Sequence, residues 1–82
     1  MKNMQYDTEK VDEVTLALMW LVMQKDNYGW RAWKGFDWDT LDRLHEKGFI
    51  SNPKSMARSV ALSDEAAELS EQLFQKYFTR AS

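Results

Sequence analysis

Tryptophan is concentrated in one short stretch of the chain, GWRAWKGFDWD at residues 29–39, which holds three of the four tryptophans. A chain of 82 residues buries only about 60% of the surface that its unfolded form exposes, so a few large side chains must build its core. Aromatic rings serve that purpose. Rings that alternate with arginine and lysine also suit base stacking and cation–π contacts. The stretch therefore predicts a core contribution, a binding platform, or a division between the two.

The positions of the aromatic residues in this stretch lead to different expectations about their burial. Phe36 and Trp38 flank the expected start of a helix, and we expect both to lie in the core, with Trp38 pointing inward. Trp30 and Trp33 stand three residues apart and can share one face with the neighbouring cations. For these two tryptophans, core and surface remain equal alternatives, because binding surfaces also favour tryptophan.

Composition excludes several classes of protein. The chain has no cysteine, which rules out disulfides and thiolate zinc sites and favours a reducing cytoplasm. The N-terminus MKNMQYDTEK lacks the apolar segment of a signal peptide. The longest apolar stretch, residues 16–23, is far too short to cross a bilayer. We therefore expect a cytoplasmic protein that makes no membrane contact.

The chain offers no catalytic set. It has one histidine and contains neither a glycine-rich phosphate loop nor a serine in an elbow motif, so no nucleophile stands with its base. Asp39, Asp42, His45 and Glu46 recur at helical steps, but such clusters usually form a solvated face rather than a metal site. The sequence predicts a protein that is not an enzyme and that holds no metal and no cofactor.

The first helix is expected over residues 8–25, after a flexible N-terminus at residues 1–7. Asp7 or Thr8 can cap it. It carries two apolar stripes, the first formed by Val11, Val14, Leu18 and Leu21, the second by Leu16, Met19, Trp20 and Met23. A helix that is apolar nearly all round must be covered on both sides. The cover is either the rest of its own chain or a second copy, and the second alternative predicts a homodimer.

The second helix is expected over residues 37–47 because its ends are clearly marked. Asp37 is the expected N-cap, and Gly48 is expected in the left-handed conformation just after the C-terminus. Phe49 would then contact Leu44, as in a Schellman motif.

The remaining segments complete one domain over residues 1–82. Residues 26–35 break the helical pattern, with Asn27 and Gly29 as turn residues and room for one helical turn at residues 30–34. Residues 49–62 read as a β-hairpin that reverses at an Asn-Pro turn. Ser63 is expected to cap a final helix over residues 63–78.

Two resemblances follow from these motifs. LDRLHEKGFI leading to SVALSDEA resembles the second half of a winged-helix domain, in which a helix ends at glycine, a wing follows, and a strand enters a closing helix. RAWKGFDWDTLDRLHEKGFISNP is similar to a family of small bacterial proteins of about this length, a domain of unknown function. The resemblance implies an α+β fold that is mostly α, a winged-helix-like three-helix domain with one small β-hairpin.

Charge decides between the partners that these resemblances imply. The net charge of −2 disfavours DNA, but residues 47–63 contain cations and no acid. The candidate interaction residues, for protein or nucleic acid, are Trp30, Arg31, Trp33, Lys34, Arg43, Lys47, Lys54 and Arg58. We expect a protein-interaction module, a homodimer through the first or last helix with a further protein partner. A DNA-binding regulator that uses the wing and the helix over residues 37–47 is the alternative.

Overall fold

The structure, a computed structural model, describes residues 4–80 and contains three α-helices and a three-stranded antiparallel sheet. The elements are α1 (Thr8–Met19), a short 3₁₀ turn η1 (Trp20–Val22), β1 (Met23–Asp26), β2 (Gly29–Trp33), α2 (Trp38–Glu46), β3 (Ser59–Leu62) and α3 (Asp64–Phe78). The predicted fold class, an α+β fold that is mostly α, is confirmed. Of the N-terminus predicted to be flexible over residues 1–7, residues 1–3 lie outside the described part of the chain.

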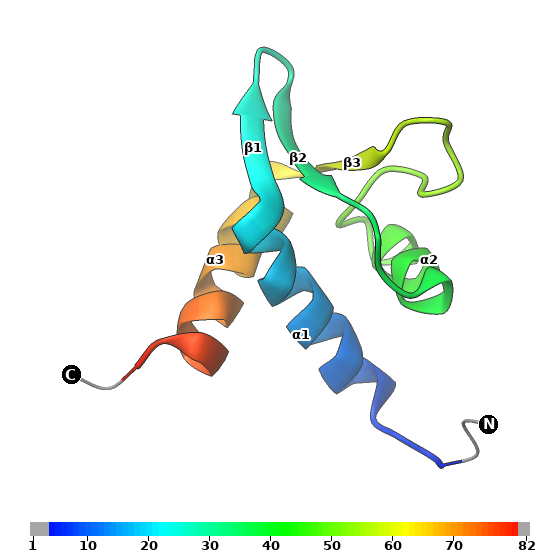
Figure 1. Ribbon diagram of the computed structural model, residues 1–82, viewed down its shortest axis with the longest axis vertical. Helices are drawn as coiled ribbons and strands as arrows, with labels where there is room; N and C mark the ends of the chain where they lie inside the picture. Colours follow the sequence, from blue (N-terminus) through cyan, green and yellow to red (C-terminus); the bar gives the residue numbers. More distant parts are fainter. Residues whose placement is uncertain (1–3, 81–82) are drawn as a thin grey trace.

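Helix α1 lies at the centre of the helical part of the fold. It runs between α3 and α2, and the sheet lies beyond its C-terminal end (Figure 1). The strand order is β1-β2-β3, so β2 is the middle strand and pairs with both neighbours. The molecule is only 18 Å thick along its shortest axis. Such a thin arrangement leaves broad faces that the chain itself does not cover.

The first helix is shorter than predicted. It was expected over residues 8–25, but α1 ends at Met19 and the chain passes through η1 into β1. Residues 23–26 pair with residues 29–32 as antiparallel strands instead of continuing the helix. In the tight turn between them, the Asp26 side chain accepts a hydrogen bond from the N–H of Tyr28 at 2.8 Å and Gly29 adopts a φ of 130°. Asn27 and Gly29 are the turn residues that were expected, but the turn joins two strands.

The helical turn predicted at residues 30–34 is wrong, because this segment is strand β2. Trp30 and Ala32 face the core while Arg31 and Trp33 face outward, the alternation of a half-buried strand. Spacing by three between the two tryptophans suggested a helix. Pairing with β1 on one side and β3 on the other makes the segment a strand instead.

Helix α2 has the ends that the sequence predicted. Asp37 caps its start by accepting from the N–H of Thr40 at 3.1 Å. Gly48 has a φ of 80°, and the N–H of Phe49 donates to the carbonyl of Leu44 at 3.1 Å, which confirms the Schellman end. The inward orientation predicted for Trp38 is wrong, because this side chain is 56% exposed. At the first position of α2 it lies outside the arc that buries Leu41 and Leu44.

The β-hairpin predicted over residues 49–62 forms only at its base. Ile50 makes a single bridge to Leu62, and the N–H of Ser51 donates to the carbonyl of Ala61 at 2.9 Å. The chain then leaves the sheet at Asn52, whose side chain accepts from the N–H of Lys54 at 2.9 Å. Strand β3 instead pairs along its length with β2, so the sheet's hairpin lies in residues 23–33.

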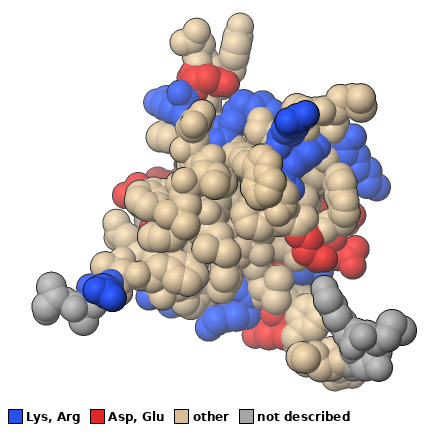
Figure 2. All heavy atoms as spheres, viewed as in Figure 1, with Lys and Arg blue, Asp and Glu red and all other residues tan. Residues whose placement is uncertain are grey.

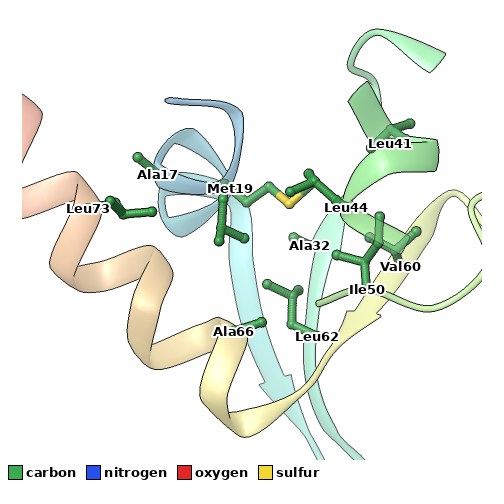
Figure 3. Packing of buried hydrophobic residues seen from close by; sticks show 11 residues of the cluster. Ala17, Met19, Ala32, Leu41, Leu44, Ile50, Val60, Leu62, Ala66 and Leu73 are labelled. Carbon is green, nitrogen blue, oxygen red and sulfur yellow. The ribbon is translucent and has the colours of Figure 1, made fainter. Parts of the chain in front are cut away.

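The final helix and the core follow the sequence pattern closely. Ser63 caps α3 by accepting from the N–H of Ala66 at 3.0 Å, as predicted. In the core, Met19 extends from α1 toward Leu44 of α2, above the inward side chains of the sheet (Figure 3). Leu16 and Met19, from the second predicted stripe of α1, are buried. The first stripe is not, which leaves an apolar face on α1.

Candidate functional site

Two surfaces of the structure contain side chains that the sequence analysis proposed for interaction or dimerisation. We call the first the sheet hollow, a cavity of about 330 Å³ on the outer face of the sheet. Its walls include Gln24, Lys25, Arg31, Trp33, Arg58 and Ser59. We call the second the α1 face, the outward apolar stripe formed by Val11, Val14, Leu18 and Leu21.

Strand pairing assembles the sheet hollow. Trp33 lies opposite Ser59 in the register of β2 and β3, and the N–H of Lys34 donates to the carbonyl of Arg58 at 3.2 Å. Arg31 donates through Nε to Ser59 Oγ at 2.8 Å and through Nη2 to the Ser59 carbonyl at 2.9 Å. The pairing therefore brings together three predicted residues that are up to 27 positions apart in the sequence, Arg31, Trp33 and Arg58.

The other candidates near the hollow have different positions. Trp30 lies on the opposite face of β2 and packs against the core, with the Lys25 ammonium 5.4 Å from its ring. Lys34 donates through Nζ to the carbonyls of Pro53 at 2.6 Å and Ser55 at 2.8 Å, so it holds the loop after α2. Lys54 is exposed on that same loop.

The two candidates on α2 are paired within the protein. The carboxylate of Asp12, only 2% exposed, accepts from Arg43 and from Lys47 Nζ at 2.9 Å. Lys47 also pairs with Glu9 at 2.9 Å. These contacts tie α2 to α1 and leave Arg43 and Lys47 fewer donors for an outside partner.

This network shifts the pKa values of its members. Burial alone would raise the pKa of the Asp12 carboxyl, but hydrogen bonds from Arg43 and Lys47 outweigh it and hold that pKa below its ordinary value. The hydrogen bond to Asp12 raises the pKa of Arg43 and of Lys47. All three groups are therefore held in their charged forms near neutral pH.

Sequence reasoning missed Asp12, although a signal for it was present. Asp12 stands four residues before Leu16 and seven before Met19, which places its side chain on the buried side of α1. A carboxylate on that side requires partners. The cations on α2 supply them.

The α1 face carries no charge from Val11 to Leu21, and Asp7 and Lys10 lie beside its N-terminal end. Asp12 turns toward α2, and Glu13 accepts a hydrogen bond from the Tyr77 hydroxyl of α3, which raises the pKa of Tyr77. Val11, Val14 and Leu18 are partly exposed, and Leu21 is 61% exposed. Figure 2 shows that uncharged side chains cover the middle of the broad face over α1 and α3, with the charged groups mainly toward its rim.

Neither a metal cluster nor a membrane span is found among the described residues. Over residues 4–80 no group of three or more histidine, cysteine, aspartate or glutamate side chains is placed to hold a metal ion. In the same part of the chain, no helix has the length and apolar character needed to span a membrane.

Comparison with known proteins places the chain in a family. The family described as "Domain of unknown function (DUF6429)" matches residues 7–80. The uncharacterised protein y4hR of Sinorhizobium fredii (strain NBRC 101917 / NGR234) is 47% identical over 77 residues, which cover 94% of this chain and 100% of that protein. No solved structure matches the chain. The resemblance to a small bacterial family of unknown function is confirmed.

Proposed function

The chain belongs to the DUF6429 family, and we propose that it is a non-enzymatic, cytoplasmic protein-interaction module that pairs with a second copy of itself through the α1 face. The observation that carries this proposal is that the acidic side chains in the middle of α1 point toward α2 and α3. Between residues 11 and 22 the acids are Asp12 and Glu13, and both are bound by α2 or α3. The opposite side of α1 is left apolar.

A second copy is the occupant that fits this face best. Its α1 face would offer the same uncharged stripe, with Asp7 and Lys10 only at the N-terminal end. Little charge would therefore lose water when the two stripes meet. The stripe residues recur at steps of three and four, the spacing with which two helices pack side by side. An apolar stripe on a molecule 18 Å thick has little of its own chain available to cover it. The pair would then present its remaining surfaces, twice over, to a further protein partner.

The ring cluster beside the stripe extends this apolar surface. Trp20 contacts Phe74 with ring centroids 4.8 Å apart, and Phe74 contacts Phe78 at 5.2 Å. Trp20 and Phe78 both remain more than one-third exposed. Partly exposed aromatic side chains are enriched at protein interfaces. They therefore favour the interaction module over a solvated, monomeric domain.

The alternative, DNA binding by the wing and α2, has less support. Winged-helix likeness is proposed only for the segment from α2 to α3, since the segment before α2 is a β-hairpin. On α2 itself, Arg43 and Lys47 bind Asp12, which reduces the positive charge that they offer to phosphates. Lys54 and Arg58 would remain for that role.

Light scattering coupled to size exclusion tests the proposal. We expect the protein to run as a dimer at low and at high salt, because apolar burial is not screened. Leu18→Glu should give a folded monomer, since it places a charge in the middle of the α1 face. Gln72→Glu adds the same charge on the exposed side of α3 and should leave the dimer intact. A wild-type protein that is monomeric at high concentration, or a dimer that survives Leu18→Glu, would overturn the proposal.

A further inference from the structure

The sheet hollow combines an ordered cation with an ordered ring. Arg31 is held by two hydrogen bonds to Ser59, so its guanidinium is fixed before any ligand arrives. The bonds use Nε and one N–H of Nη2, and the other N–H groups of the guanidinium are free for an acceptor in the hollow.

The indole of Trp33 is also held in place by neighbouring residues. It lies so close to Gly35 that a Cβ built there would be 2.0 Å from Trp33 Cη2. The ring of Phe36 supports it with a centroid distance of 6.3 Å. Even so, Trp33 is 56% exposed. The indole is therefore a fixed platform with free surface, and the glycine is what allows it to lie there.

Charge at the hollow opposes that of the whole chain. Arg31 and Arg58 line it with a single acid, Asp26, although the chain has a net charge of −2. Lys25 also borders the hollow, but its ammonium lies over the Trp30 ring on the other face of the sheet. Asp26 accepts from the N–H of Tyr28. Within residues 4–80, neither Arg31 nor Arg58 forms a salt bridge. Lys and Arg side chains also gather in Figure 2 over the region where Figure 1 shows β2, β3 and the loop before β3.

We propose that the sheet hollow binds single-stranded nucleic acid, with a base stacked on Trp33 and the adjoining phosphates on Arg31 and Arg58. A ring platform beside cations is the combination that single strands use. The volume of about 330 Å³ suits one nucleotide rather than a long groove. A duplex keeps its bases stacked within itself and offers none to the ring. An acidic peptide would use the cations but not the indole.

This site is separate from the proposed dimer surface. Its lining comes from β1, β2, the loop before β3, Ser59 of β3 and Val22 of η1, whereas the α1 face lies on α1 and ends at Leu21 of η1, so no residue belongs to both. The two proposals can therefore fail independently. Leu18→Glu should change the oligomeric state and leave nucleic-acid binding intact.

Fluorescence anisotropy with a labelled deoxythymidine decamer, at a salt concentration of about 50 mM, is the test. We expect saturable binding that weakens about tenfold for Trp33→Ala, since stacking of one base contributes that much. Gly35→Ala should weaken binding in the same direction by displacing the indole, without removing a ring or a charge. Arg58→Ala, at an exposed position, should weaken it and reduce the salt dependence.

Two matched controls separate the site from general effects. Trp38 is as exposed as Trp33, at 56%, but does not line the hollow, so Trp38→Ala should bind normally. Arg80→Ala removes one exposed cation near the C-terminus and should also bind normally. Far-ultraviolet circular dichroism on each variant would confirm that it is folded. Arg58→Ala keeps the test valid if either Trp33 or Gly35 proves essential for folding.

Other probes decide between single strands and their competitors. An abasic decamer, a duplex of the same length and polyglutamate should each bind at least tenfold more weakly than the deoxythymidine decamer. The proposal is overturned if the decamer does not bind, if the abasic chain or the duplex binds equally well, or if polyglutamate does, which would indicate an acidic protein segment.

Discussion

The Nε–H of Arg43 on α2 is shared between the two carboxylate oxygens of Asp12 on α1, at N–O distances of 2.8 and 3.1 Å. Asp12 is almost completely buried, and Lys47 Nζ also donates to it at 2.9 Å. Arg43 also donates to the Thr40 hydroxyl, which in turn donates to Asp37, the cap of α2. The start of α2, its middle and the first helix thus belong to one polar network. This network fixes how the two helices lie together.

Removing the acid at its centre should cost much of the protein's stability. We expect Asp12→Asn to lower the free energy of unfolding by roughly 2–4 kcal/mol, because the buried amide would no longer neutralise Arg43 and Lys47 and would turn an N–H donor toward theirs. Urea unfolding measures the change. Asp39→Asn, on the exposed side of α2, should stay within about 0.5 kcal/mol of the wild type. Equal effects at both positions would mean that the network contributes little.

Acid should weaken the fold through the same carboxylate. The pKa of Asp12 lies below its ordinary value of 3.8 in the folded protein. Its contribution to stability is therefore present above that value and is lost as the pH falls toward the folded pKa. The free energy of unfolding of the wild type should drop more steeply below about pH 4 than that of Asp12→Asn. Parallel curves for the two proteins would contradict this account.

The contact between α1 and α3 contains one buried hydroxyl. Ser70 Oγ donates to the carbonyl of Leu16 at 2.6 Å, and the side chain is fully buried. Ser70→Ala should therefore lower the free energy of unfolding by about 1 kcal/mol, since a buried carbonyl loses its donor. Ser55→Ala, at an exposed position, serves as the control in thermal unfolding. A stabilised Ser70→Ala variant would show that packing outweighs the hydrogen bond here.

Gly48 should be replaceable only at a conformational cost. Its φ is 80°, and a Cβ built there would have no atom within 4 Å, so the backbone alone sets the penalty. We expect Gly48→Ala to lower stability by about 1–2 kcal/mol. Gly48→Asn should lower it less, because asparagine tolerates this conformation better. If both variants unfold at the wild-type midpoint in urea, the left-handed end of α2 is not essential.

Lys47 distinguishes the proposed nucleic-acid site from DNA binding by α2. Because Lys47 pairs with Glu9 and Asp12, Lys47→Ala should leave the affinity for the deoxythymidine decamer unchanged within about twofold. The same anisotropy measurement checks this. A loss as large as that of Arg58→Ala would instead place the nucleic acid along α2.

Several elements could be predicted because their signals are local. The capping residues Asp37, Gly48 and Ser63 affect hydrogen bonds of N–H and C=O groups only a few residues away. The ends of α2 and the start of α3 could therefore be predicted from the sequence. The interaction residues were harder to predict. The sequence shows which of them are cations or rings. Whether a given cation pairs with a carboxylate depends on a helix or strand elsewhere in the chain.

The central strand shows where local signals fail. Residues 29–33 form the central strand β2 because β1 and β3 supply hydrogen bonds on both sides. The segment does not itself encode the pairing with β3, which comes from beyond α2 and the loop after it. Trp30 and Trp33 were consequently left open. Strand alternation decides the matter by sending Trp30 to the core and Trp33 to the outer face.

By itself, then, the sequence determined the helical character of the fold, the capped ends of α2 and α3, and the apolar stripes of α1, because each depends on backbone geometry and spacing within one segment. Only the tertiary structure decided which stripe of α1 is covered, which cations Asp12 neutralises, and which ones remain beside Trp33. Those outcomes depend on charge and apolar surface from distant segments meeting in one place, and the chain's folding brings them together.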